Sequence, residues 1–162
     1  MSNSNAFQHP LQQPLNPYLR TKVLTSGPAD LRLMLLDGAV KFARQGREGI
    51  AGKDFEAMFN GISQCRDIVV ELMTSIGPEV EASLAHKVRG VFTFIFSELT
   101  SASMEKSVTR MDKVIGLLEF ERETWAMLIE KLRAEQTGGL GGSAGGGVGV
   151  GKATVTAVSL AG

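Results

Sequence analysis

The segment from residue 54 to residue 76 carries the most regular apolar repeat in the chain, and it constrains the fold more than any other feature. Asp54 is a typical N-cap residue, and Gly77-Pro78 both ends this helix and begins the next one. The apolar residues follow one another at intervals of four, three, four, three and four: Met58, Ile62, Cys65, Val69, Leu72 and Ile76. This spacing is typical of the seam of a left-handed helix bundle.

Three further segments show helical patterns. The first begins at Pro28, with Gly27 as N-cap and Asp30 near the positive helix end; the others run over residues 78–101 and 105–136. The residues expected to point inward are Leu31, Leu35, Gly38 and Phe42; Val80, Leu84, Val88, Val91, Phe92, Ile95 and Leu99; and Val108, Met111, Ile115, Leu118, Trp125, Leu128 and Leu132. Four helices with short links predict an all-α fold, an antiparallel four-helix bundle.

Three glycines of the first helix, Gly38, Gly46 and Gly49, fall on one face at 100° per residue. An interior glycine costs roughly 1 kcal/mol relative to alanine, so their clustering predicts the close approach of a neighbouring helix. The alternative is that the helix frays after Gln45.

Charge and composition exclude several classes of partner. The chain has 17 basic and 17 acidic residues, and residues 28–136 carry a net charge of −3. This balance argues against nucleic acid and anionic lipid as partners. No stretch is long enough to span a membrane and residues 1–27 hold no apolar signal core, so we expect a cytoplasmic protein. Cys65 is the only cysteine, and its place on the apolar seam predicts a buried, reduced thiol.

Both ends of the chain differ from the helical part. Residues 1–15, rich in Asn, Gln, Ser and Pro, are expected to be disordered, and residues 137–162 are expected to form a flexible Gly-rich tail. Residues 149–154 resemble a phosphate-binding loop only in composition, because the full glycine spacing and a preceding strand are missing. The sequence therefore predicts no nucleotide site there.

Residues 16–27 form an extended apolar strip that runs directly into the first helix. Pro17 and Pro28 restrict the backbone at its ends, and its β-branched residues disfavour a helix. Three helices also carry more apolar surface than a bundle face needs, which predicts a groove that accepts foreign apolar surface, with the strip as its lid. The candidate partner-binding residues are Tyr18, Val23, Leu24, Leu33, Leu36, Val40, Phe94 and Phe96.

At these positions the chain resembles the FliS family of flagellar secretion chaperones. The resemblance rests on Asn16-Pro17-Tyr18, Val23-Leu24-Thr25, Leu31 to Ala39, Ile68 to Leu72 and Glu121 to Trp125, in this order. It implies a four-helix chaperone domain over residues 16–136 that binds the C-terminal segment of flagellin, prevents premature polymerisation and aids delivery to the flagellar type III export apparatus. Components of the export gate are a further implied partner. Leu36 stands where the family usually has an aromatic residue.

The main alternative is a histidine phosphotransfer module. Ala85-His86-Lys87-Val88-Arg89-Gly90 resembles the motif of such four-helix domains, in which His86 would accept a phosphoryl group and Arg89 would stabilise it. Enzymes fit less well. A di-iron bundle needs repeated Glu-x-x-His pairs, whereas the chain has only His9 and His86, and no Ser or Cys is linked to a histidine by a motif. We therefore expect no catalytic site, no metal, no cofactor and no small-molecule substrate.

Overall fold

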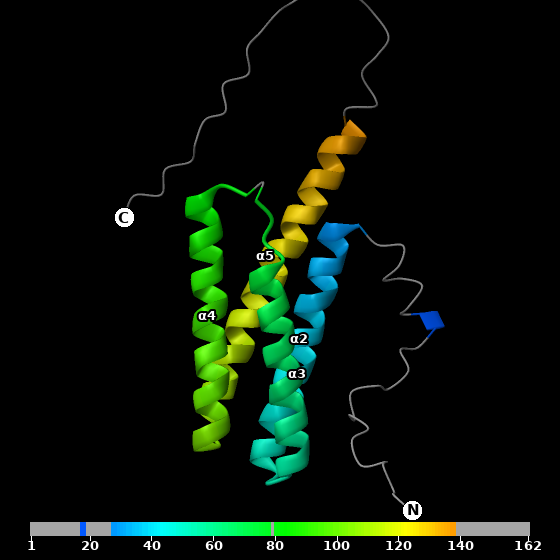
Figure 1. Ribbon diagram of the computed structural model, residues 1–162. Helices are drawn as coiled ribbons and strands as arrows, with labels where there is room; N and C mark the ends of the chain where they lie inside the picture. Colours follow the sequence, from blue (N-terminus) through cyan, green and yellow to red (C-terminus); the bar gives the residue numbers. More distant parts are fainter. Residues whose placement is uncertain (1–16, 19–26, 79, 139–162) are drawn as a thin grey trace, which may run out of the picture.

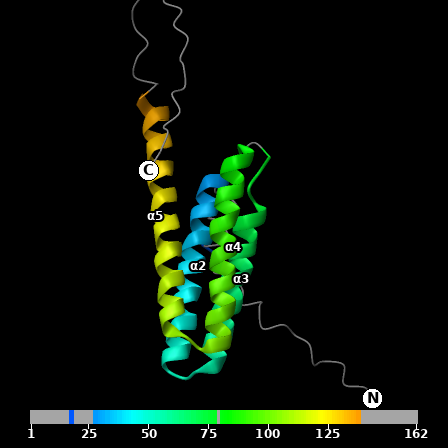
Figure 2. The same ribbon diagram turned by 90° about the vertical axis from the view of Figure 1, so that its left-hand side faces the viewer.

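A computed structural model describes residues 17–18, 27–78 and 80–138 of the chain. The helices of the bundle are α2 (Pro28–Ala51), α3 (Phe55–Thr74), α4 (Ala82–Glu105) and α5 (Val108–Gly138). Successive helices run in opposite directions, and α2 and α4 each pack against both α3 and α5 (Figures 1 and 2). The predicted all-α, antiparallel four-helix bundle is confirmed. The predicted disordered N-terminus, residues 1–15, lies outside the described residues, as do residues 139–162 of the predicted tail over 137–162 and most of the strip. Residues 137–138, expected in the tail, belong to α5, and residues 17–18 of the strip, expected to be extended, are helical.

Local capping explains where the helices begin. Gly27 is the N-cap of α2, and the Asp54 side chain accepts a hydrogen bond of 3.0 Å from the amide of Ala57 at the start of α3, both as predicted. The predicted start of the third helix at Pro78 is wrong. The Val80 amide donates to the carbonyl of Gly77, which closes a turn, and α4 begins only at Ala82.

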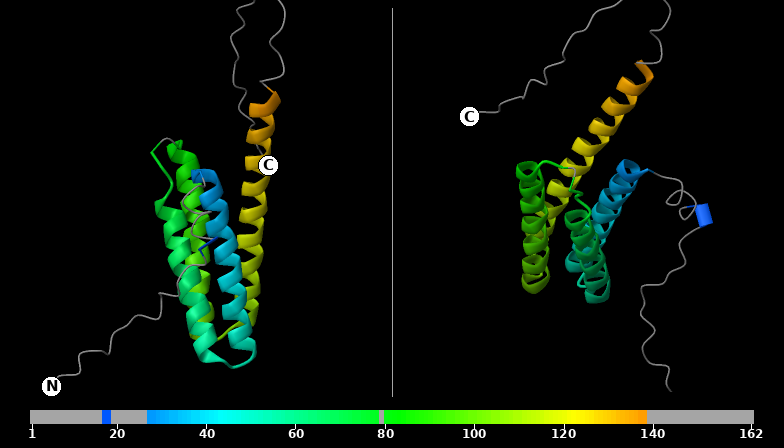
Figure 3. Two further views of the ribbon diagram at one scale, coloured as in Figure 1. Left: turned by 90° about the vertical axis from the view of Figure 1, so that its right-hand side faces the viewer. Right: turned by 45° about the horizontal axis from the view of Figure 1, so that its top comes forward.

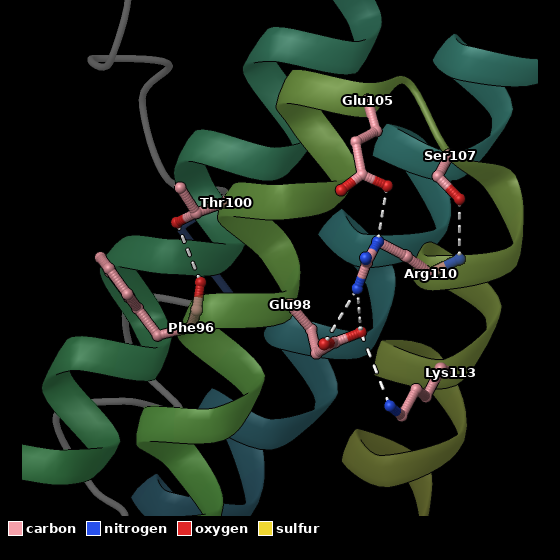
Figure 4. Close-up of polar contacts among 7 residues, drawn as sticks. All are labelled: Phe96, Glu98, Thr100, Glu105, Ser107, Arg110 and Lys113. Atoms are coloured by element: carbon pink, nitrogen blue, oxygen red, sulfur yellow. Dashed lines mark hydrogen bonds and ion pairs between the residues drawn. The ribbon is translucent and has the colours of Figure 1, made fainter.

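The link between α4 and α5 is held by a compact polar cluster (Figure 4). Lys106 adopts a left-handed conformation after α4, with φ of 51°, and the Ser107 hydroxyl accepts from the Arg110 amide. The fourth helix therefore begins at Val108 rather than at Glu105. The Arg110 side chain donates to Glu105 on the preceding helix and also to Glu98, which Lys113 contacts as well. Thr100 donates to the carbonyl of Phe96, as is common within helices.

The core of the bundle is continuous from the seam of α3 outward. Met58, Ile62, Cys65, Val69 and Leu72 are all at most 8% exposed, which confirms these five seam positions and the buried thiol. The prediction is wrong for Ile76, which is half-buried in the turn after α3 because the helix already ends at Thr74. They pack with core residues of the other helices, among them Ala39, Ala43, Phe92, Ile95, Leu99, Met111, Val114 and Leu118. None of the helices in the described part of the chain has the length and apolar character needed to cross a membrane.

Glycines allow α2 and α3 to approach at backbone distance. A Cβ atom on Gly49 would lie 2.7 Å from the Cα of Met58, and one on Gly61 would lie 2.8 Å from the Cα of Gly46. Such contacts are too short for any side chain, so only glycine fits. The predicted close approach is confirmed, and the fraying alternative is wrong because α2 continues to Ala51. Gly61 is a partner in this contact that the sequence analysis did not identify.

Ion pairs join α2 to α5 along the outside of the bundle. The charge that α2 contributes to these pairs changes along the helix: its own residues in the pairs are acidic near its start and basic near its end. The pairs are Asp30–Arg133, Asp37–Arg122, Arg44–Glu119 and Arg47–Asp112. Each pair is solvent-exposed and adds little stability by itself, but together the pairs favour one register of the antiparallel helices.

Candidate functional site

The bundle opens at the end where α2 begins and α3 ends. Toward this end α5 diverges from α4 and extends beyond the other helices (Figures 1 and 3). Three residues predicted to point into the core are exposed there as a result: Leu84 on α4 is 52% exposed, and Leu128 and Leu132 on α5 are 42% and 46% exposed. That prediction is therefore wrong for these three leucines, because no helix in the described part of the chain covers them.

An apolar groove of about 850 Å³ lies at this open end. The first two turns of α2, the end of α3, the turn that follows it and the start of α4 form its walls, and Trp125 of α5 closes one side. Most of its lining is aliphatic, with contributions from Leu31, Met34, Leu35, Ile68, Ile76, Val80, Leu84 and Val88. A groove of this character suits the apolar face of an amphipathic segment.

Three hydrogen bonds from two side chains fix the rim of the groove. The Trp125 indole N–H donates a hydrogen bond of 2.9 Å to the carbonyl of Ala29, which joins α5 to the first turn of α2. The Arg32 Nη1 atom donates at 3.2 Å to both the carbonyl of Leu72 and the hydroxyl of Ser75, which joins α2 to the end of α3. These bonds hold both side chains in place, so the groove is preformed on three helices.

Arg32 is a cation inside this largely apolar groove. Its Cζ atom lies 5.7 Å from the ring centre of Phe92 and 5.3 Å from that of Trp125, within the range of cation–π attraction. Burial lowers the pKa of Arg32, and the nearby Glu121 partly offsets this shift. Burial also raises the pKa of Glu121, against the attraction of Arg32. The guanidinium nevertheless stays protonated, because the ordinary pKa of arginine lies far above neutral pH.

Those candidate residues from the sequence that the structure describes do not line this groove. Tyr18 is 75% exposed, and Val23 and Leu24 lie outside the described residues. Leu33 is half-buried on α2. Phe94 is 44% exposed beneath the ammonium group of Lys113, and Phe96 lies against the guanidinium of Arg66.

Leu36 and Val40 require a correction. They were expected to lie beside the core face as spare apolar surface, but they are only 2% and 7% exposed and belong to the core. The reason is that α2 packs against both α3 and α5, so its buried arc combines two seams. A wide apolar arc on α2 therefore reflects two neighbours rather than an open surface.

His86, the candidate for phosphoryl transfer, is exposed on α4. A Cβ on Gly90 would meet nothing within 4 Å, so this face is open. Arg89, however, reaches toward the end of α3, where it donates at 3.4 Å to the carbonyl of Ile76.

Comparison with known proteins decides the family. Residues 11–132 match the family model described as "Flagellar protein FliS". The chain belongs to the FliS family. It is 24% identical over 128 residues to the flagellar secretion chaperone FliS of Bacillus subtilis (strain 168), an alignment that covers 79% of this chain and 95% of the relative. It is also 24% identical over 110 residues to the flagellar secretion chaperone FliS of Campylobacter jejuni, with 68% and 86% covered.

Membership in the FliS family confirms the resemblance found in the sequence. The chain is a chaperone of flagellar export and not an enzyme. The match to the family ends at residue 132, so the Gly-rich segment lies beyond it. All the residues that line the open groove lie inside the matched range.

Proposed function

We propose that the chain is a cytoplasmic export chaperone that binds the C-terminal segment of flagellin, prevents its premature polymerisation and aids its delivery to the flagellar type III export apparatus. The apolar groove at the open end of the bundle is the observation that supports this proposal. A segment that polymerises through apolar helical surface is protected when a groove of matching character covers that surface. Export gate components are a second proposed partner, which would receive the loaded chaperone.

Capture in this groove is a helix-in-groove interaction. Leu84, Leu128 and Leu132, which are about half exposed without a client, become buried when an amphipathic helix lies across them. Folding of a disordered client on binding costs roughly 2–5 kcal/mol, so the client must cover more than the groove alone. The exposed leucines of α5, which extends beyond the groove, supply such additional surface.

The N-terminal strip is proposed as a removable lid over the same groove. Pro28 and Ala29 line the groove, so the strip is attached directly at its rim. The nine residues between Tyr18 and Pro28 span at most about 30 Å when extended, which lets the strip fold back across the opening. A lid lowers client affinity by the free energy of its closed state, and it keeps the empty groove from self-association.

Co-purification tests the client assignment. The chaperone is mixed with full-length flagellin and with flagellin that lacks its C-terminal segment. We expect binding to the first and a large loss with the second; equal binding to both would contradict the proposal.

The phosphotransfer alternative is tested separately. The wild-type protein and His86→Gln are incubated with a small-molecule phosphodonor and analysed for acid-labile label. Stable labelling of the wild type alone would favour a phosphorelay role, whereas the chaperone proposal expects neither protein to be labelled.

A further inference from the structure

Among the residues that the structure describes, Arg32 is the one cationic side chain that lines the apolar groove, and Glu71 of α3 is the one anionic side chain. The α2 residues that line the groove extend from Pro28 to Leu35, so Arg32 lies within the wall and not at its edge. A charge placed among aliphatic side chains costs free energy unless it is paired. Its presence in a surface that binds apolar segments therefore needs a physical reason.

The known contacts of Arg32 use only part of its guanidinium. Both hydrogen bonds leave from Nη1, to Leu72 and Ser75 of α3. Among the residues that the structure describes, none accepts a hydrogen bond from Nε or Nη2, and no carboxylate lies within ion-pair distance of the group. Glu121 acts on Arg32 only through longer-range attraction. The Nε–Nη2 edge is thus available to a ligand.

The side chain is also held in place before any ligand arrives. Phe92 and Trp125 flank the guanidinium, and the two bonds to α3 fix its direction. A planar, preoriented guanidinium edge matches a carboxylate, which it binds through two parallel hydrogen bonds. Pre-orientation reduces the side-chain entropy that is lost when the pair forms.

We infer that Arg32 selects an acidic side chain, Asp or Glu, inside the apolar segment that the groove captures. This inference rests on the proposed chaperone function and names a specificity-determining residue for it. Because the groove continues along α2 on both sides of Arg32, the carboxylate belongs to a residue within the captured segment rather than to a chain terminus. A captured segment then shows apolar residues on both sides of one acidic residue on the same helical face.

The client and the proposed lid also differ in charge. The strip over residues 16–27 contains Arg20 and Lys22 and no acidic residue. As the proposed lid, the strip therefore has no carboxylate with which to neutralise Arg32. A client with a correctly placed carboxylate therefore gains an interaction that the lid lacks, which favours exchange of lid for client.

A double-mutant cycle tests this inference with the full-length chaperone. The probe is a synthetic peptide of the C-terminal segment of the flagellin encoded in the same genome, in which each Asp is changed to Asn and each Glu to Gln, one at a time. Binding is measured by calorimetry. We expect one of these changes to weaken binding to the wild type by about tenfold or more, as for other hydrogen bonds to charged groups. The same change should alter binding to Arg32→Gln by less than about twofold.

Two further variants make the result specific. Arg44→Gln removes the same charge from the same helix, but Arg44 pairs with Glu119 outside the groove. The amide change in the peptide should therefore weaken binding to this variant as much as it weakens binding to the wild type. Arg32→Lys keeps the charge and loses the planar edge, so its coupling should be intermediate. Circular dichroism and thermal unfolding verify that the variants are folded; if Arg32→Gln is not, Arg32→Lys carries the test.

The possible outcomes distinguish a failure of the inference from a failure of the proposed function. If the wild type binds the peptide but no amide change couples to Arg32, the inference is overturned and the chaperone function stands. If the wild type does not bind the peptide at all, both are overturned. If the amide change weakens binding to Arg32→Gln as much as binding to the wild type, the carboxylate pairs with another cation, and the inference is overturned.

Discussion

Replacing Gly61 with alanine tests the most restrictive contact in the bundle. Gly61 of α3 faces the backbone of α2, where an added Cβ would lie 2.7 Å from the carbonyl oxygen of Phe42 and 2.8 Å from the Cα of Gly46, and closer still to the amide nitrogen of Gly46. All three atoms are backbone atoms, so no side-chain rotation can relieve the contact. The two helices must move apart to accept the methyl group.

The expected loss of stability follows from two opposing terms. Alanine in place of an interior glycine favours the helix by about 1 kcal/mol. Overpacking costs typically 1–3 kcal/mol where side chains can adjust, and separating two backbones weakens the dispersion contacts along the whole α2–α3 interface. We therefore expect Gly61→Ala to lower the free energy of unfolding by about 2 kcal/mol or more in total.

Gly116→Ala is the matched control. Gly116 also lies inside a helix, but a Cβ there would meet nothing within 4 Å. Only the helix-propensity term remains, so this variant should raise the free energy of unfolding by up to about 1 kcal/mol. Urea unfolding followed by circular dichroism measures both variants against the wild type. A Gly61→Ala protein as stable as the wild type, or as Gly116→Ala, would refute the argument that backbone contact dictates glycine at position 61.

Three further predictions concern single side chains. Removal of the α3 N-cap in Asp54→Ala should lower the free energy of unfolding by about 1 kcal/mol, measured by urea unfolding; no change would show that the cap is not needed. Burial raises the pKa of the Cys65 thiol to about 12, so the thiol should resist a thiol reagent at pH 8 until the protein unfolds. In the unfolded chain the thiol ionises near pH 9, so between about pH 9 and 12 only the unfolded state loses this proton, and the free energy of unfolding should fall as the pH rises through this range. Rapid labelling of the native protein would contradict its burial. Tyr18→Ala should weaken the proposed lid, raising client affinity and lowering monomer solubility; if neither changes, the lid is refuted and the chaperone function stands.

The fold could be predicted because several local signals agree. The regular spacing from Met58 to Leu72 identifies a helix with one buried face, and Asp54 marks where it begins. The glycines of α2 indicate a close neighbour, which α3 provides. Helix starts were predicted less well where a turn intervenes, as at Pro78, because a proline is equally compatible with a turn and with the first turn of a helix.

The site was harder to predict because it depends on how the helices diverge. Leu128 and Leu132 continue the apolar stripe of α5, and nothing in their spacing reveals that α4 is no longer opposite them. Leu36 and Val40 show the converse: they widen the apolar arc of α2, yet the second neighbour α5 covers them. Single-helix patterns report which residues are apolar but not which helix faces them, and that is a tertiary property.

The fluorescence of Trp125 tests the central claim, that the groove at the open end holds the client, most directly. Trp125 is the only tryptophan of the chain and lines this groove, so its emission reports on the site without a label. The protein is titrated with a flagellin C-terminal segment that contains no tryptophan, and binding is followed in parallel by calorimetry. The account predicts a saturable blue shift and reduced quenching by acrylamide, with the midpoint that calorimetry gives. Tight binding with unchanged emission and quenching of Trp125 would contradict it.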